Sequence, residues 1–428
     1  MSILLAILYV VVFIFLIYRL EFFQTNGISK RIISAIFILK ILSGFGLIFI
    51  YTHYYKTRES ADIYKYFDDA KVIYSAAYEA PVDYLKMITG IDSDSDYLRE
   101  MYFSKTNSWY KEWDYHLYND NRTITRFNAL AMLISNQSIY IHTIFMAFLS
   151  LIGLLSIYKV FVNYLKGKEK LLIIFTFLLP TVMLWSSGVL KEGILVFAFG
   201  IMFLGFYRMI QKFSFRYLLL FSIGIALLSI TKFYTLMAAI PGMIALLWIQ
   251  KTNGKRPFLK FIIVHTLAFI GVISNNYVLF VLYKKQVDFQ ILIDGLTTQV
   301  GSYISVPNLE PTALSFLKNA PIAFSNTFLR PHIFEVYSPV VFFAAAENLL
   351  IIMGLVLSLI FINKRKISNY SLLYFSIFFV VIMFILCGLV TPVMGALVRY
   401  KMPALPFLFI IFIMIVDIDK IKRFLKKG

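Results

Sequence analysis

The sequence contains a single cysteine, Cys387, among 428 residues. One cysteine excludes a disulfide within the chain and any metal site built from paired cysteines. Its apolar neighbours are typical of a buried, inert thiol. Charged residues are also scarce, at 15% of the chain, whereas 60% of the residues are hydrophobic. A soluble protein of this length does not need so much apolar sequence.

Several motifs of soluble enzymes are missing as well. The chain has no glycine-rich phosphate loop, no His-x-Glu metal spacing and no Gly-x-Ser-x-Gly elbow. These gaps argue against a P-loop NTPase, a zinc enzyme of that type and an α/β-hydrolase. We also find no internal repeat, which transporters commonly show.

Apolar runs that are long enough to cross a bilayer recur along the chain. Ser2–Tyr18, Ile33–Tyr51 and Val340–Ile362 approach or exceed the ~20 residues that a spanning helix needs. Such runs must be helical, because lipid offers the backbone no hydrogen-bond partner. We therefore predict an all-α, polytopic integral membrane protein, a single transmembrane domain over residues 1–428 with about eleven transmembrane helices. The predicted spans are residues 1–18, 32–53, 138–158, 171–187, 193–207, 217–232, 235–250, 261–283, 338–362, 371–391 and 403–416.

Basic residues are concentrated in alternate connections between these runs. The segments are residues 19–31, 159–170, 208–216, 251–260 and 364–366 and the basic tail 417–428. Together they hold 22 Lys and Arg but only four Asp and Glu, whereas the other connections hold 18 residues of each sign. The formal net charge of +18 therefore arises on one side, as in cytoplasmic connections, and does not indicate a nucleic-acid partner. We predict an N-terminus outside and a cytoplasmic C-terminus in the inner (plasma) membrane.

Two predicted outer segments are much longer than the other connections. Extracytoplasmic loop 1 covers residues 53–137 and holds 13 of the 23 acidic residues, ten basic residues and many tyrosines and tryptophans. Extracytoplasmic loop 2 covers residues 284–337 and has four residues of each sign. Long segments in compact proteins are commonly functional, and the aromatic content favours folded structure. We therefore expect the chemistry on the outer face.

The most informative stretch of loop 1 runs from Asp62 to Tyr74. Helical spacing puts Asp62, Tyr66 and Asp69 on one face, whereas Asp68 points elsewhere. A carboxylate just outside the membrane, flanked by aromatic rings, suits a general base that deprotonates an acceptor hydroxyl. Two carboxylates could also hold a divalent cation, Mg²⁺ or Mn²⁺, on a phosphate. The simpler alternative is an amphipathic interfacial helix with solvated charges.

Asp62 opens the pattern Asp-x-x-x-Tyr-x-x-x-Ala, early in the first large outer loop. This setting resembles the GT-C superfamily of membrane glycosyltransferases. The resemblance implies a polyprenyl-phosphate-linked sugar donor on the outer face and an acidic residue of the first loop as base or metal ligand. Here the acidic loop follows the second predicted span instead of the first, and no Asp-Glu pair stands at Asp62. The base therefore stays open between Asp62, Asp68 and Asp69, with Asp62 the best match.

Three further segments place cations at the predicted outer membrane boundary. They also resemble segments of membrane proteins encoded in polysaccharide loci. They are Trp185–Gly193, Leu329–Glu335 with Glu347–Asn348, and Val398–Pro403, and their cations are Lys191, Arg330, His332, Arg399 and Lys401. A lipid-linked sugar presents its phosphate at that depth, and an arginine fork can bind phosphate oxygens in pairs. The alternative is snorkelling of long basic side chains towards lipid headgroups.

Glu347 lies deep in its predicted span. A carboxylate inside the membrane is costly and is a functional candidate by default. Three roles stay open: pairing with Arg330, pairing with Lys40, or buried structural hydrogen bonding. We expect His142 and His265 to be structural.

These features predict a glycosyltransferase that uses a polyprenyl-phosphate-linked sugar for cell-surface glycan synthesis. Asp62 would act as base, assisted by Asp69 or Asp68, and the acceptor would be a glycan or a lipid-linked molecule. The expected binding residues for the lipid phosphate and the substrate are Tyr66, Lys191, Arg330, His332, Glu347 and Arg399. A polymerase of the O-antigen or exopolysaccharide type would share the large outer loops and the arginines. A lipid-glycan flippase or transporter is the third hypothesis, which the scarcity of charges within the spans disfavours.

Overall fold

The computed structural model describes residues 2–54, 57–58, 61–110, 118–294 and 303–426, and these residues are mostly helical. Within the described ranges there is no β-strand, only three isolated bridges. The all-α prediction is therefore confirmed for this part of the chain. Two compact units are distinguished by their internal contacts, and each is described by itself.

Unit 1 comprises Met1–Val160, Met183–Tyr207 and Ser214–Phe233. Its helices are α1 (Ser2–Arg19), α2 (Lys30–Tyr54), α3 (Asp62–Glu79), α4 (Pro81–Thr89), α5 (Asp96–Met101), α6 (Asn121–Ser135), nearly all of α7 (Ile139–Phe161), most of α10 (Lys191–Gln211) and α11 (Phe215–Thr231). The short helix α9 (Pro180–Trp185) is shared by the two units. Two 3-10 turns, η1 (Glu21–Phe23) and η3 (Phe103–Lys105), complete the unit within the described residues.

Unit 2 comprises Phe161–Val182, Arg208–Phe213 and Tyr234–Gly428. Its helices are α8 (Glu169–Phe177), nearly all of α12 (Phe233–Lys251), α13 (Pro257–Ile273), α14 (Asn276–Asp294), α15 (Ala313–Leu329), α16 (Pro339–Ile360), α17 (Tyr370–Val390), α18 (Met394–Lys401), α19 (Leu405–Ile415) and α20 (Ile418–Leu425). The 3-10 turns are η4 (Val162–Tyr164), η5 (Ile333–Glu335), η6 (Lys364–Lys366) and η7 (Met402–Ala404).

Long apolar helices identify a multi-pass membrane protein. Among the described residues, 7 helices are long and apolar enough to cross a membrane, or 8 if α13 and α14, bent by 78°, form one span. Two further predicted spans are the shorter apolar helices Ile3–Arg19 and Phe215–Thr231, and the predicted span 171–187 is divided between α8 and α9. The total of about eleven spans and the orientation therefore stay predictions.

Glycines allow the helices of unit 1 to pack with their backbones in contact. A Cβ atom on Gly200 of α10 would lie 2.0 Å from the carbonyl oxygen of Gly153 in α7. A Cβ atom on Gly153 would in turn lie 2.2 Å from the carbonyl oxygen of Val196. Small residues at such crossings are how membrane helices approach closely. The position of α10 against α7 therefore depends on both glycines.

Helices α10 and α11 form an antiparallel pair. Gly205, near the end of α10, lies against Tyr217 near the start of α11, and Gly224 of α11 lies against Ala198 of α10. This pairing puts the first residue of α10, Lys191, at the same end of unit 1 as Lys232, the residue that follows α11.

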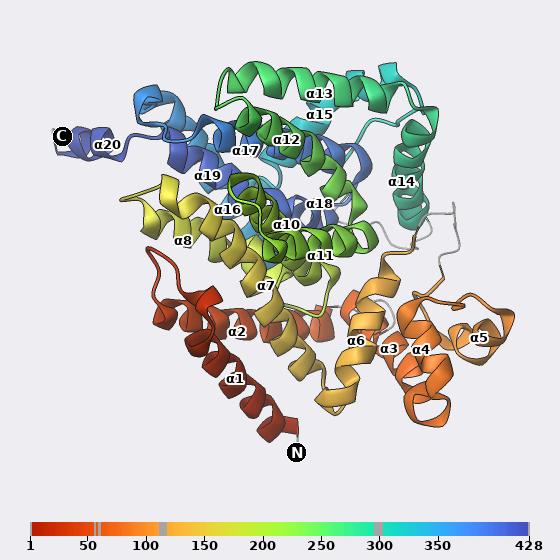
Figure 1. The fold of residues 1–428 in the computed structure, drawn as a ribbon. Helices are drawn as coiled ribbons and strands as arrows, with labels where there is room; N and C mark the ends of the chain where they lie inside the picture. The colour runs from red at the N-terminus through yellow and green to blue at the C-terminus, as the bar shows by residue number, and fades with distance from the viewer. Residues whose placement is uncertain (1, 55–56, 59–60, 111–117, 295–302, 427–428) are drawn as a thin grey trace. The chain divides into compact units, whose positions relative to one another are not determined.

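The described part of loop 1 is a folded helical layer with its own apolar core. Figure 1 shows α3, α4 and α6 side by side, and these helices bury a cluster that includes Phe67, Tyr84 and Met132. Trp109 is fully buried, with its ring stacked on Phe103 at a centroid distance of 4.3 Å. The aromatic residues that the sequence concentrates in this segment therefore build its core.

Loop 2 is largely helical instead of an irregular connection. Residues 284–337 include the second half of α14 and all of α15, and α15 packs along α17. A Cβ atom on Gly388 of α17 would lie 2.1 Å from the carbonyl oxygen of Ala323, and the Thr327 hydroxyl donates to the Phe384 carbonyl at 2.8 Å. Apolar positions on one face of α15 explain this packing, because Phe316 and Ala323 are buried in the same cluster.

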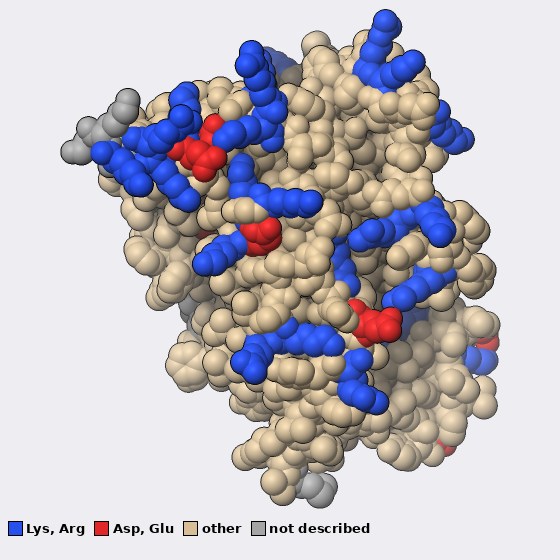
Figure 2. Space-filling model, turned by 60° about the vertical axis from the view of Figure 1, so that its left-hand side comes forward, with Lys and Arg blue, Asp and Glu red and all other residues tan. Residues whose placement is uncertain are grey.

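Basic side chains dominate the face drawn in Figure 2, where Asp and Glu are few. In the C-terminal tail the acidic residues are already paired: Lys366 contacts Asp417 at 2.9 Å and Asp419 at 2.8 Å. The tail is tied to η6 by these contacts and by the hydrogen bond from Asn363 to Asp417.

Replacement of Gly200 by alanine tests the helix crossing. The added methyl group would meet the Gly153 backbone, so we expect a loss of about 1–3 kcal/mol in unfolding free energy and a lower melting temperature in detergent. Gly46→Ala in α2 is the matched control, because a Cβ atom there meets nothing within 4 Å. Alanine is also the better helix former, so the control should melt at the wild-type temperature or higher. Equal melting temperatures for the two variants would contradict a backbone-limited crossing.

Candidate functional site

Helix α3 presents the carboxylates that the sequence singles out. Asp62 is its first residue and is half-buried, and Tyr66, one turn further on, is buried. A carboxylate at this position also complements the positive end of the helix dipole. Asp68 is also half-buried, and its carboxylate contacts Arg58 Nε at 2.6 Å and Lys71 Nζ at 3.7 Å. Asp68 is thus engaged in an ion pair at the side of α3 that carries Lys71, and the choice between Asp62 and Asp68 as the base stays a prediction.

Asp69 is buried and hydrogen-bonded within loop 1. Its carboxylate accepts the backbone N–H of Asn107 at 2.7 Å, that of Ser108 at 2.8 Å, and the Ser108 hydroxyl. Burial raises the pKa of the Asp69 carboxyl, and the hydrogen bonds from Ser108 and Asn107 oppose that shift. These contacts fix residues 107–108 against α3. The role of Asp69 as an assisting base or metal ligand stays a prediction.

A cluster of charges lies at the end of unit 1 where α10 begins and α11 ends. The Nζ atoms of Lys191 and Lys232 approach one oxygen of Asp120, Oδ2, at 3.0 Å and 2.8 Å. Both lysine side chains are only 8% exposed and that of Asp120 is 22% exposed. Two ammonium groups therefore converge on a single anionic oxygen in a largely desolvated position, where charge interactions are strong.

The surroundings of Lys191 connect this cluster to α3. Lys191 Nζ also donates to Asn121 Oδ1 at 2.8 Å and lies 5.5 Å from the centre of the Tyr66 ring. The Asn121 amide in turn donates to the carbonyl of Ser108 at 3.2 Å. Asp69 holds that same Ser108, so it positions the lysine cluster through two intermediate residues. The next residue in α10, Glu192, is buried beside the cluster.

A second cluster of cations lies in unit 2 around Lys401, a buried residue of α18. Lys401 Nζ donates to the carbonyl oxygens of Thr327 at 3.1 Å and Arg330 at 2.8 Å and to Asn348 Oδ1 at 2.9 Å. The Asn348 amide donates to the carbonyl of Pro331 at 3.2 Å. The segment that carries Arg330 is thereby fixed to α16 and α18.

Arg330 and His332 lie on this fixed segment. Arg330 Nε is 3.5 Å from Glu335 Oε1, and the backbone N–H of His332 donates to Glu335 Oε2 at 2.8 Å. Arg330 is half-buried and His332 is exposed, whereas Arg399, two residues before Lys401, is 9% exposed. The structure therefore brings together the second and third predicted cation segments, with Lys401 as the residue that joins them.

Glu347 has a structural partner in unit 2. Its carboxylate accepts the backbone N–H of Thr181 at 2.9 Å, at the start of α9. Lys40 donates to Ser186 Oγ at 2.7 Å, and the ion-pair contact of Arg330 is to Glu335. Of the three roles that the sequence left open for Glu347, the contacts favour buried hydrogen bonding. His142 is structural as expected, with Ser135 at 2.7 Å and Asn128 at 2.9 Å.

No group of three His, Cys, Asp or Glu side chains that could hold a metal occurs in the part of the chain that the structure describes.

Asp120 is the residue of the site that the sequence patterns missed. It contacts Lys232 across 112 positions of the chain, so no local spacing relates the two. The only usable signal was the pair of lysines at the predicted outer boundary, which a carboxylate of loop 1 would be expected to neutralise.

No family model, no curated protein and no solved structure matches this chain. Its function is therefore inferred from the chemistry of its own residues.

Replacement of Asp120 by asparagine tests the buried charge cluster. The variant would leave Lys191 and Lys232 close together without the carboxylate, and removal of one partner of a buried ion pair costs about 3 kcal/mol. We expect a clear drop in melting temperature in detergent and partial recovery when Lys232→Met is added. Asp68→Asn is the matched control, because its ion pair with Arg58 is solvent-exposed and contributes at most about 1 kcal/mol. A drop of the same size in the control would contradict the assignment.

Proposed function

We propose that this protein is a membrane glycosyltransferase that takes a sugar from a polyprenyl-phosphate-linked donor on the extracytoplasmic face and transfers it to a glycan or lipid-linked acceptor. The observation that carries the proposal is the convergence of Lys191 and Lys232 on one oxygen of Asp120, beside the Tyr66 ring. Two ammonium groups that share one anionic oxygen form a geometry that a phosphate oxygen also fits.

The location of the cluster supports a lipid-borne phosphate. Lys191 and Lys232 stand at the same end of the apolar helices α10 and α11. If these helices span the bilayer as proposed, that end would lie near the depth of a lipid-borne phosphate. Asp62 lies one helical turn before Tyr66, whose ring centre is 5.5 Å from Lys191 Nζ. Asp62, as the base, would then face the acceptor side of the sugar, and Lys191 and Lys232 would face its phosphate side.

The transfer assigns a task to each group. The acceptor oxygen forms a bond to the anomeric carbon of the sugar while the bond from that carbon to the phosphate oxygen breaks. The acceptor proton passes to Asp62, and the electron pair of the broken bond leaves with the lipid phosphate. Lys191 and Lys232 stabilise the charge that develops on the phosphate, the usual task of fixed cations in such sites. The phosphate would take the place that the Asp120 carboxylate occupies between the lysines.

A polysaccharide polymerase is the second candidate, and the cluster in unit 2 favours it. Lys401 joins the segment of Arg330 and His332 to α18, the helix that also carries Arg399. Cations on these two segments could engage the diphosphate of a lipid-linked repeat unit. In that case the arginines, and not Asp62, would dominate activity.

Replacement of Asp62 by asparagine tests the transferase proposal. The gene is deleted in its host and restored as wild type, Asp62→Asn, Asp68→Asn or Arg330→Ala at matched membrane levels, and surface glycans and lipid-linked intermediates are profiled. Loss of the base should reduce transfer by about 100-fold or more, so Asp62→Asn should lose one defined sugar and accumulate the unglycosylated acceptor. Asp68→Asn, whose carboxylate pairs with Arg58, should restore the normal profile.

Two other outcomes discriminate between the candidates. Accumulation of single repeat units without long chains, strongest in Arg330→Ala, would indicate a polymerase. A normal profile from Asp62→Asn would rule out Asp62 as the base.

A further inference from the structure

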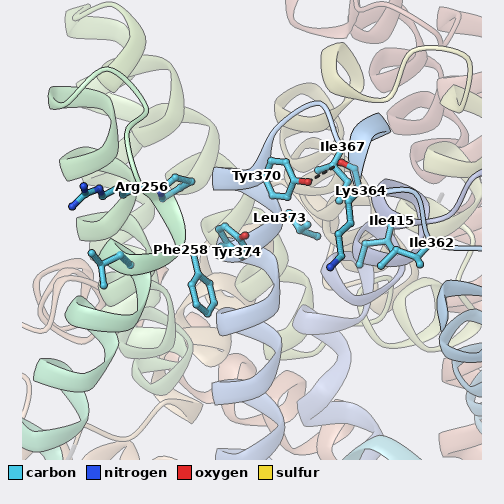
Figure 3. A pocket seen from close by; sticks show the side chains of 11 residues that line it. Arg256, Phe258, Ile362, Lys364, Ile367, Tyr370, Leu373, Tyr374 and Ile415 are labelled. Carbon is cyan, nitrogen blue, oxygen red and sulfur yellow. Dashed lines mark hydrogen bonds between the residues drawn. The ribbon is translucent and has the colours of Figure 1, made fainter.

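A groove of about 720 Å³ opens in unit 2 where α13 begins, beside η6 and the first turns of α17 (Figure 3). Its wall is apolar and aromatic, formed by Phe258 of α13, Tyr374 of α17 and Ile415 of α19 among others. Several of these side chains are open to their surroundings: Phe258 is 55% and Leu259 is 47% exposed. An exposed apolar wall of this kind indicates a binding site for a ligand that is itself partly apolar.

Two cations stand at opposite edges of the groove. Arg256 precedes α13 and Lys364 belongs to η6, as Figure 3 shows, and none of the eleven lining residues is acidic. The neighbouring Lys366 is neutralised by Asp417 and Asp419. No ion pair of Arg256 or Lys364 is found among the described residues. The groove therefore combines an apolar wall with a positive rim.

The helix ends around the groove mark the edge of the membrane. Helices α13 and α17 begin here and α19 ends here, and α17 and the run that ends with α19 are long enough to span. The beginnings of α13 and α17 also contribute the positive ends of their dipoles. Tyr370 fixes η6 by donating its hydroxyl to the Lys364 carbonyl at 2.7 Å. Both connections belong to the basic set that the sequence predicts to be cytoplasmic.

We propose that this groove binds one anionic phospholipid of the adjoining leaflet. The positive rim attracts the anionic headgroup to the mouth of the groove, and an acyl chain covers Phe258, Tyr374 and Ile415. Basic pockets between membrane helices on this side are suited to anionic headgroups. A soluble anion would leave the apolar wall uncovered, and a zwitterionic lipid would leave the rim charge uncompensated. The site is independent of the proposed glycosyl transfer.

Native mass spectrometry of the full-length protein in detergent tests the charge at the rim. Phosphatidylglycerol and phosphatidylcholine are titrated against wild type, the double variant Arg256→Gln/Lys364→Gln and the control Lys212→Gln/Arg216→Gln. The control removes the same charge from two exposed residues of another basic connection. We expect wild type and control to prefer phosphatidylglycerol, and the groove variant to bind it more weakly by on the order of tenfold. Excess glycerol phosphate should not compete, because it lacks the acyl chain.

A second measurement reports on the apolar wall. A tryptophan introduced as Tyr374→Trp should be quenched by phosphatidylglycerol brominated on its acyl chains, and addition of Arg256→Gln/Lys364→Gln should remove that extra quenching. An equal loss of affinity in the Lys212→Gln/Arg216→Gln control would show a general charge effect and overturn the proposal. Unchanged affinity in the groove variant, or full competition by glycerol phosphate, would overturn it too.

Discussion

Two buried lysines share one carboxylate oxygen, and three helix ends of unit 1 are arranged around that contact. Lys191 begins α10, Lys232 follows α11, and Asp120 immediately precedes α6, so one ion-pair cluster fixes three helix ends. Without the carboxylate, two ammonium groups would lie close together with little solvent between them. The folded layer of loop 1 is therefore required for the membrane helices beneath it, and not only attached to them.

The sequence predicts those features that depend on local patterns. Apolar runs locate most of the long helices, because lipid leaves the backbone no alternative to internal hydrogen bonding. Contacts between residues that are far apart in the sequence could not be predicted from local patterns. Asp69 was predicted to be chemically active, since its spacing places it beside Asp62 and Tyr66. The return of residues 107–108 to α3, which occupies its carboxylate, leaves no trace in local periodicity.

The buried lysines of the two units are stabilised in different ways. Lys191 and Lys232 contact a carboxylate directly. The hydrogen bonds of Lys401 go to two backbone carbonyls and an asparagine, and the Glu347 carboxylate acts on it only through its charge. Backbone carbonyls keep their positions as long as the backbone keeps its conformation. Such partners suit Lys401, which joins three segments of unit 2. A side-chain carboxylate can turn away when a competing anion arrives. This contrast explains why we place the proposed phosphate site in unit 1 and assign Lys401 a positioning role.

The contact between Gly153 and Gly200 also has a consequence for biogenesis. Glycine adds almost nothing to the hydrophobicity by which a segment partitions into the bilayer, so neither residue helps α7 or α10 to insert. Their contribution begins only after both segments are in the membrane, since α10 is synthesised after α7 and the α8–α9 region that follows it. Insertion and assembly are thus encoded by different residues of the same helices. A substitution at Gly200 would therefore disturb the packing of inserted helices and leave the insertion of α10 unchanged.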